Sequence, residues 1–222
     1  VRAGNSVLVE GMPGTGRSTF AMEFLARGAR DYDEPGYFMT FTSSMAEALA
    51  NNESFGWDLP RLAEAKLFHF TESSAKAFAE DFQKNCERLV SEVQKLKIKR
   101  LAIDGLCGLK SYLEKGGVSY SEAVEKLLRS FKALAITSFV TTNLAQNSLI
   151  GQSGAGDEQY LADTIISLGN QERGKSVHRY IEIVKSRGQN FRSGRHSLMI
   201  IDGFGVRVFP RASVRAGDFN PQ

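Results

Sequence analysis

The stretch Gly11-Met12-Pro13-Gly14-Thr15-Gly16-Arg17-Ser18-Thr19 decides the fold of this chain. Its spacing is that of the Walker A pattern, in which a glycine is followed, after four residues, by glycine, lysine and a hydroxyl residue. Glycines let the backbone N–H groups of such a loop turn inward around phosphate oxygens. The apolar run before it predicts a strand over 6–9, and Phe20, Phe24 and Leu25 predict a helix over 18–29. A phosphate-binding loop joins a strand to a helix, so the stretch indicates a nucleoside triphosphate site.

Arg17 occupies the position of the Walker A lysine. That lysine normally reaches the β- and γ-phosphates, and the hydroxyl that follows it binds Mg²⁺. Arginine keeps the positive charge, but its planar guanidinium is larger than an ammonium. We therefore expect weaker nucleotide affinity and slower phosphoryl transfer, with Ser18 as the hydroxyl that faces Mg²⁺. The predicted nucleotide-binding residues are Gly11, Pro13, Gly14, Thr15, Gly16, Arg17, Ser18 and Thr19.

A second motif is the run Lys99-Arg100-Leu101-Ala102-Ile103-Asp104, which has the form of a Walker B strand. A carboxylate at the C-terminal edge of a central strand lies beside the phosphate-binding loop and can hold Mg²⁺. We therefore predict Asp104 as a catalytic residue and, with Ser18, as a metal-binding residue. ATP and Mg²⁺ are the expected cofactors. The alternative is that Asp104 only caps the next turn.

Length and composition fit one α/β domain. The chain has 222 residues, of which 42% are hydrophobic and 24% are charged, as in ordinary globular proteins. No apolar run approaches the ~20 residues of a membrane-spanning helix, so we expect no membrane contact. Cys86 and Cys107 show no metal-binding spacing, which favours free thiols in the reducing cytoplasm.

Positive charge gathers in the last third of the chain. Residues 171–215 contain ten Lys or Arg and three acidic residues, whereas the rest of the chain is net negative. Such a basic segment could meet nucleic acid, the phosphates of a nucleotide, or an acidic neighbouring subunit.

Strand and helix patterns alternate through the first two thirds of the chain, which predicts a mostly parallel sheet covered on both faces. The expected helices span about 18–29, 44–49, 74–96 and 119–133, two of them opened by the capping boxes Ser44/Glu47 and Ser119/Glu122. After residue 161, four strand-like runs over 164–168, 177–184, 197–201 and 206–209 suggest an antiparallel extension. We expect one domain over 1–210 and a flexible tail over 211–222.

The chain resembles the KaiC-like ATPases of the RecA superfamily, from Val1 to about Pro210. The segments that carry the likeness are GMPGTGRST (Gly11–Thr19), FGWDL (Phe55–Leu59), Asp104, Asp163 in LADTIISL, KSRG (Lys185–Gly188) and the closing IIDGFGVRVFP. The usual opening segment is missing, so further sequence is expected before Val1. Within FGWDL, Trp57 is expected to anchor packing.

This resemblance implies a RecA-like P-loop fold and a hexameric ring with ATP at the subunit interfaces. It assigns Lys185 and Arg187 the catalytic role of reaching the γ-phosphate held by the neighbouring subunit. Cations supplied in this way stabilise charge on the transferring phosphoryl group. The alternative is a solvated basic loop. Thr141-Thr142-Asn143 lies where related ATPases sense the γ-phosphate, or else forms a plain strand end.

One departure from the family concerns two adjacent glutamates after the second strand, one of which activates the attacking water. Here Phe41 is followed by Thr42-Ser43-Ser44. A hydroxyl cannot accept a proton as a carboxylate does at neutral pH. The nearest carboxylate belongs to Glu47, and the capping box already explains that residue.

Three functions follow as hypotheses. The favoured one is a ring-forming ATP-binding protein that hydrolyses slowly or not at all and acts as a regulatory or scaffold subunit with a protein signalling partner. The second is an active ATPase that uses Glu47 or Glu53 as its catalytic carboxylate. The third is a RecA-type DNA-binding ATPase. It is not favoured, because 145–156, where a DNA-contacting loop would lie, has no Lys or Arg.

Overall fold

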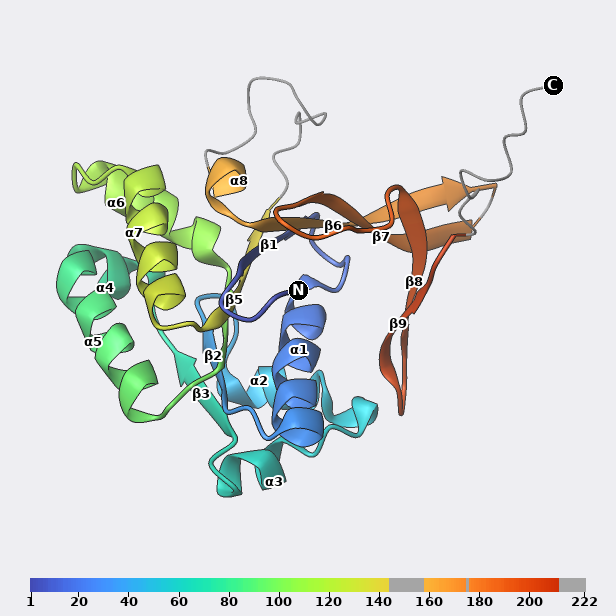
Figure 1. Ribbon diagram of the computed structural model, residues 1–222, viewed down its shortest axis with the longest axis horizontal. Helices are drawn as coiled ribbons and strands as arrows, with labels where there is room; N and C mark the ends of the chain where they lie inside the picture. The colour runs from blue at the N-terminus through green and yellow to red at the C-terminus, as the bar shows by residue number, and fades with distance from the viewer. Residues whose placement is uncertain (144–157, 175, 212–222) are drawn as a thin grey trace.

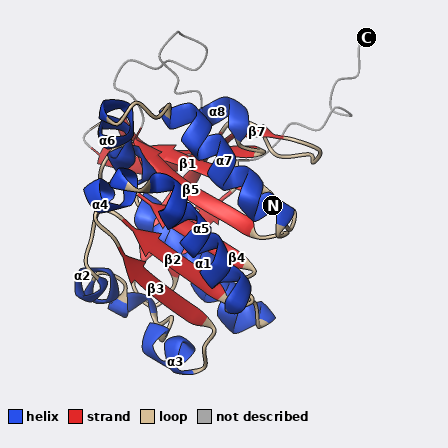
Figure 2. Ribbon diagram, turned by 90° about the vertical axis from the view of Figure 1, so that its left-hand side faces the viewer, coloured by secondary structure: helices blue, strands red, loops and turns tan. Residues whose placement is uncertain are grey.

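The computed structural model describes residues 1–143, 158–174 and 176–211. These residues form a nine-stranded sheet in the order β3-β2-β4-β5-β1-β6-β7-β8-β9, with helices on both faces (Figures 1 and 2). The six strands from β3 to β6 in this order are parallel, and β6 to β9 pair antiparallel. This architecture confirms the predicted α/β, RecA-like fold with an antiparallel C-terminal extension.

Strands and helices alternate along the chain as far as β5, as the sequence patterns predicted. Their bounds are β1 Ser6–Gly11, β2 Gly36–Thr40, β3 Phe68–Glu72, β4 Arg100–Asp104, β5 Thr137–Asn143, β6 Thr164–Arg173, β7 Ser176–Ser186, β8 Arg195–Ile201 and β9 Gly205–Phe209. The four strands predicted after residue 161 pair antiparallel with one another, and β6 joins them to the rest of the sheet by pairing parallel with β1.

The helices divide between the two faces of the sheet. Their bounds are α1 Arg17–Tyr32, α2 Met45–Ala50, α3 Leu59–Glu64, α4 Ala75–Glu80, α5 Phe82–Lys95, α6 Lys110–Lys115, α7 Tyr120–Ala133 and α8 Glu158–Leu161, with 3₁₀ turns η1 Glu53–Phe55 and η2 Leu106–Leu109. Figure 1 shows α4–α7 on one face and α1–α3 on the other. Successive strand residues alternate between the two cores: Tyr37 packs toward α5 and α7, and Phe38 toward α1.

The predicted helix over 74–96 is broken into α4 and α5 at Asp81, whose backbone has φ −131° and ψ 57°. The Asn85 side chain donates hydrogen bonds to the carbonyls of Ala77 and Phe78, at 3.2 and 3.1 Å, so the carbonyls freed by the break are satisfied. Phe78 and Phe82 flank the break and both enter the core. The apolar periodicity thus crosses the break, which is why the sequence pattern did not reveal it.

Two predicted capping residues start helices as expected. The Ser44 hydroxyl accepts from the Glu47 N–H, and the Glu47 carboxylate accepts from the Ser44 N–H at 2.8 Å, which completes the capping box of α2. Ser119 caps α7 by accepting from the Glu122 N–H at 3.4 Å. Helices α3 and α6, neither of which has a side-chain cap, were not predicted from the sequence. Of the expected tail over 211–222, all but residue 211 lies outside the described residues.

Candidate functional site

The loop between β1 and α1 adopts a backbone that its glycines require. Gly14 and Gly16 have φ of 82° and 96°, in the left-handed region that side chains rarely adopt. A Cβ on Gly11 would lie 2.5 Å from the Leu168 carbonyl oxygen, and one on Gly16 would lie 2.5 Å from Ile200 Cδ1. The loop is therefore packed tightly between β6 and β8 and ends at the first turn of α1.

This loop fits a polyphosphate. The N–H groups in the first turn of a helix have no intrahelical partner, and the helix dipole places partial positive charge there. Thr15 closes the loop locally, because its backbone N–H and its hydroxyl both donate to the Met12 carbonyl, at 3.3 and 2.8 Å. A Cβ on Gly14 would meet no described atom within 4 Å beyond its chain neighbours, so the loop is open to a ligand at this position.

Asp104 lies at the end of β4 and is 2% exposed. Three hydroxyl groups donate to its carboxylate: Ser18 at 2.9 Å, Thr42 at 3.0 Å and Thr141 at 2.6 Å. Thr141 in turn accepts from the Gly105 N–H at 2.9 Å. The fold thus brings together Ser18 and Asp104, the two predicted metal-binding residues. Hydroxyl and carboxylate oxygens are ligands that Mg²⁺ prefers, so the donor set fits this ion.

The Arg17 guanidinium turns toward the end of β5. It donates one hydrogen bond to the Thr142 carbonyl and a second, of 2.7 Å, to Asn143 Oδ1. Burial lowers the pKa of Arg17, and the nearby Asp104 carboxylate acts in the opposite direction. The guanidinium is therefore engaged with the end of β5, for which a γ-phosphate sensor and a plain strand end were the two interpretations.

Hydroxyl groups stand where the family has its glutamates. Thr42 follows β2 and bonds Asp104, and Ser43 lies beside Thr40 at an oxygen–oxygen distance of 3.4 Å. Hydrogen bonds from the backbone and side chain of Ser44 hold the pKa of the Glu47 carboxyl below its ordinary value. Glu47 is thus engaged in capping α2, as predicted.

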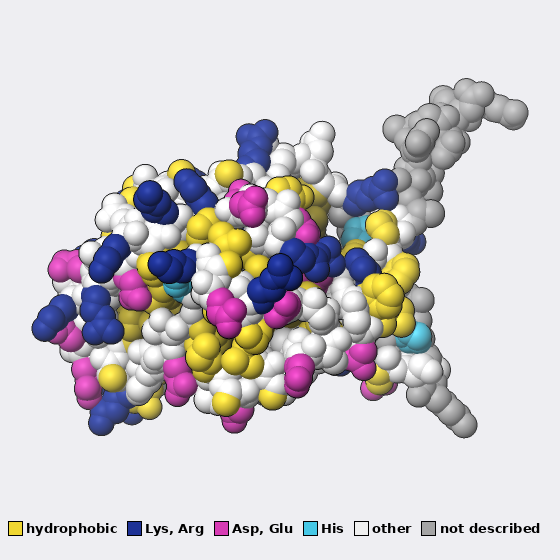
Figure 3. All heavy atoms as spheres, turned by 90° about the horizontal axis from the view of Figure 1, so that it is seen from below, with side chains coloured by type: hydrophobic (Ala, Val, Ile, Leu, Met, Phe, Trp, Pro, Cys, Tyr) yellow, Lys and Arg dark blue, Asp and Glu magenta, His cyan; other side chains and the backbone are white. Residues whose placement is uncertain are grey.

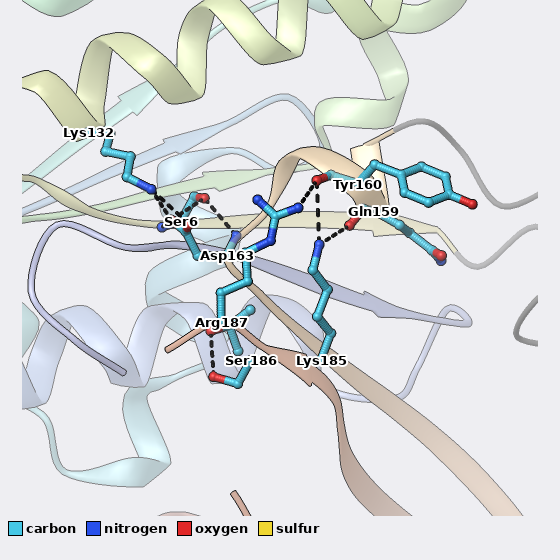
Figure 4. A network of polar contacts seen from close by, with 9 residues as sticks. Ser6, Lys132, Gln159, Tyr160, Asp163, Lys185, Ser186 and Arg187 are labelled. Atoms are coloured by element: carbon cyan, nitrogen blue, oxygen red, sulfur yellow. Dashed lines mark hydrogen bonds and ion pairs between the residues drawn. The ribbon is translucent and has the colours of Figure 1, made fainter. Parts of the chain in front are cut away.

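Lys185 and Arg187, at the end of β7 and just beyond it, reach the C-terminal end of α8 (Figure 4). Lys185 Nζ donates to the Gln159 carbonyl at 2.9 Å, and Arg187 donates to the Tyr160 carbonyl at 3.0 Å. Burial and then the positive charge of Arg187 lower the pKa of Lys185, against a smaller opposite effect of Asp163. The two cations therefore lie side by side on the negative end of a helix.

Comparison with known proteins identifies the family. The protein family described as "ATPase: KaiC" matches residues 1–213. The chain belongs to the KaiC ATPase family. This confirms the resemblance drawn from the motifs and makes the chain a KaiC-like, ATP-binding P-loop domain, here with an altered Walker A lysine and without the paired glutamates.

Individual relatives agree with this assignment. The chain is 31% identical to the circadian clock oscillator protein KaiC of Synechococcus elongatus over 218 residues and 32% identical to that of Nostoc sp. over 220 residues. Each alignment covers 96% of this chain and 41% of the relative. The chain therefore spans about two fifths of the length of these curated relatives.

Asp163 ties three elements of this KaiC-family domain together (Figure 4). The residue is 6% exposed, and its carboxylate accepts from the Ser6 N–H and hydroxyl, at 3.0 and 3.1 Å, and from Lys132 Nζ at 2.8 Å. Its backbone carbonyl accepts from the Arg187 N–H at 2.8 Å. Asp163 thus joins β1, α7 and the segment after β7 that carries Arg187.

Replacing Asp163 with asparagine is expected to lower the free energy of unfolding by about 2 kcal/mol at neutral pH, because a buried, charge-assisted network loses its anion. Urea unfolding measures this change. Asp33→Asn is the matched control, since Asp33 is exposed and its left-handed backbone suits asparagine. We expect this control to stay within about 0.5 kcal/mol of the parent. An Asp163→Asn protein as stable as the control would contradict the assigned role.

The pH dependence of the same variant has a definite sign. Burial tends to raise the pKa of Asp163, but hydrogen bonds from Lys132 and Ser6 outweigh it and hold the pKa below its ordinary value of 3.8. A depressed pKa contributes stability above the unfolded-state value, and this contribution is lost as the pH falls through the folded-state value. The difference in the free energy of unfolding between the parent and Asp163→Asn should therefore become smaller below about pH 4.

The β8–β9 hairpin is a part of the site that residue-level reasoning missed. Ile200 packs against Gly16 of the loop, and the Ser54 hydroxyl donates to Asp202 at 2.8 Å. The Gly203 N–H also donates to the Ser54 carbonyl at 2.7 Å. Strands over 197–201 and 206–209 were predicted, but their contact with the phosphate loop was not, because it depends on the order of strands in the sheet.

For two expectations, a DNA-contacting loop and the absence of membrane contact, the structure gives information only on the described residues. The segment 145–156, where a DNA-contacting loop would lie, is outside them. Among the residues that the structure does describe, no helix is both long enough and apolar enough to cross a membrane.

Proposed function

We propose that residues 1–210 form one Mg·ATP-binding domain that hydrolyses ATP slowly or not at all and acts as a regulatory or scaffold subunit of a ring. The observation that carries this proposal is the contrast between an intact phosphate loop and altered catalytic positions. The loop, Ser18 and Asp104 keep the geometry for a nucleotide and Mg²⁺. In contrast, Arg17 is bonded to Thr142 and Asn143, and hydroxyls replace the glutamates.

In this proposal the nucleotide lies against Gly11, Pro13, Gly14, Thr15, Gly16, Arg17, Ser18 and Thr19, with Mg²⁺ held by Ser18 and Asp104. Bound Mg²⁺ would neutralise phosphate charge. Lys185 and Arg187 serve the nucleotide of a neighbouring copy, which makes ATP a ligand shared between subunits of a homo-oligomer, by family likeness a hexamer. A protein signalling partner completes the proposal, but its identity does not follow from the site.

The alternative, an active ATPase with Glu47 as its catalytic carboxylate, has less support, because the Glu47 carboxylate accepts hydrogen bonds from Ser44 in the capping box. DNA binding stays a prediction, which is not favoured because 145–156 contains no Lys or Arg. A cytoplasmic location is proposed from the two free cysteines, Cys86 and Cys107. Burial raises the pKa of Cys86 to about 12, so this thiol stays protonated and unreactive at neutral pH.

Calorimetric titration with Mg·ATP tests the proposal. We expect saturable binding in the micromolar range and phosphate release close to background. Asp104→Asn should weaken binding of Mg·ATP about tenfold, since one metal ligand loses its charge, while binding of metal-free ATP in a chelator changes little. No binding up to millimolar Mg·ATP would overturn the proposed site. Rapid hydrolysis that Asp104→Asn abolishes would overturn the proposed slow turnover.

A further inference from the structure

The phosphate loop offers donors that no helix bond occupies. The first intrahelical bond of α1 runs from the Phe20 N–H to the Gly16 carbonyl at 2.9 Å, so the N–H groups of residues 17–19 have no partner within the helix. In Walker A loops, backbone N–H groups of this kind cradle the α- and β-phosphates. A nucleoside diphosphate can therefore bind here without displacing a helix bond.

The cations expected at the γ-phosphate are in a different state, because all three donate to protein acceptors. Arg17 donates to the Thr142 carbonyl and to Asn143 Oδ1. Lys185 and Arg187, expected to reach a neighbouring copy's nucleotide, donate to carbonyls at the end of α8. A γ-phosphate must therefore displace these bonds or bind without the cations, whereas the backbone donors for the β-phosphate are unaffected.

The course of the Arg17 side chain explains why it reaches β5. A Cβ on Gly11 would lie 3.4 Å from Arg17 Cδ, so the aliphatic part of the side chain passes the start of the loop. Gly11 is paired with Asn143 in the register of β1 and β5, which places the end of β5 directly beside this point. A planar guanidinium with two acceptors is held in one orientation, unlike the ammonium of a lysine.

We propose that this domain selects a nucleoside diphosphate over a triphosphate, and that Arg17, held by Asn143, sets the preference. The inference rests on the proposed nucleotide site and names the ligand that it favours. Both nucleotides use the loop and bring Mg²⁺ to Asp104. The triphosphate adds a further negative charge near this buried carboxylate, and Arg17 does not offset that charge while it is bonded to β5.

The test compares nucleotides by calorimetry, with Mg·ADP, Mg·ATP and the Mg²⁺ complex of the β,γ-imido analogue of ATP, whose bridging nitrogen resists hydrolysis. We expect the parent to bind Mg·ADP roughly tenfold more tightly than either triphosphate, the equivalent of one charge-assisted contact. Arg17→Lys should bring the ratio of the two affinities close to one, because a lysine ammonium reaches the γ-phosphate. Asn143→Ala should lower the ratio about threefold, since the guanidinium keeps only its bond to Thr142.

Arg61→Lys is the matched control for the change of Arg17 to lysine. Arg61 is exposed and lies on α3, which Figure 1 shows at the lower end of the molecule. Figure 3 looks onto that end, where basic and acidic side chains are interspersed among the described residues. We expect this control to keep the affinities of the parent for all three nucleotides.

The outcomes separate this inference from the proposed function. If the parent bound none of the nucleotides up to millimolar concentration, the proposed site itself would be wrong, and the diphosphate preference would fall with it. If the parent bound the triphosphates as tightly as Mg·ADP, the site would stand and the preference would be overturned. A preference that Arg17→Lys left unchanged would remove Arg17 as its cause. A preference that grew in Asn143→Ala would mean that Asn143 contacts the γ-phosphate itself, against the role given to it here.

Discussion

Replacing Arg17 with lysine is expected to tighten Mg·ATP binding by roughly 10- to 100-fold. In the present arrangement the guanidinium donates to the Thr142 carbonyl and to Asn143 Oδ1, so a nucleotide must compete with these bonds or bind without this cation. A lysine ammonium is compact and reaches the β- and γ-phosphates from this position in Walker A loops. One recovered charge-assisted contact corresponds to about 1.5–3 kcal/mol, which gives the expected range.

Calorimetry with Mg·ATP measures this change in affinity. Arg27→Lys is the matched control, because Arg27 lies on the same helix and pairs with Glu23 at 2.6 Å, away from the phosphate loop. We expect that control to keep the affinity of the parent. If Arg17→Lys bound Mg·ATP no more tightly than the parent, the guanidinium would already serve the phosphates as well as an ammonium, and the proposed weakening would be wrong.

The site residues close to one another in sequence could be predicted, because their geometry depends on local backbone. The glycines of 11–16, with Ser18 at the start of α1, needed only the Walker A spacing and a strand before it. Asp104 could be predicted because parallel strands bring their carboxyl ends to one edge of the sheet. The structure indeed joins Ser18 to Asp104 at 2.9 Å.

Partners far apart in sequence could not be predicted from residue types alone. The sequence does not show that the Arg17 guanidinium would bond Asn143, which lies 126 positions away. The same holds for Asp163 and Ser6, 157 positions apart, whose contact exists only because β1 and β6 are neighbours in the sheet. Tertiary pairing, and not local propensity, decides such contacts.

Two features of the fold, the break at Asp81 and the parallel pairing of β6 with β1, could not be predicted from the apolar pattern of the sequence. The segment 75–95 keeps the apolar period of one continuous helix, since Phe78 and Phe82 enter the same core. The Asn85 hydrogen bonds at the break and the parallel pairing of β6 with β1 leave no periodic trace in the sequence.

Restoring two glutamates is the change with the largest expected effect on turnover. In the Arg17→Lys background, the pair Thr42→Glu and Ser43→Glu is expected to raise the rate of phosphate release at saturating Mg·ATP by about 10²-fold or more. Thr42 already donates to Asp104 at 3.0 Å, so we expect a carboxylate at 42 or 43 to stand beside this proposed metal ligand, within reach of an attacking water. General base catalysis typically contributes 10²–10⁴-fold.

The matched control is Thr42→Gln with Ser43→Gln in the same background, which has nearly the same shape but cannot accept a proton at neutral pH. Mg·ATP affinity, measured for both pairs, separates a change in chemistry from a change in binding. The added negative charge near Asp104 attracts Mg²⁺ but repels ATP, so the two pairs are compared at the Mg²⁺ and ATP concentrations that saturate each of them. If the glutamine pair accelerated turnover as much as the glutamate pair, proton transfer would not be the missing step. If neither pair accelerated turnover, the absent glutamates would not explain slow hydrolysis, and the engagement of Lys185 and Arg187 with the carbonyls of α8 would become the favoured cause.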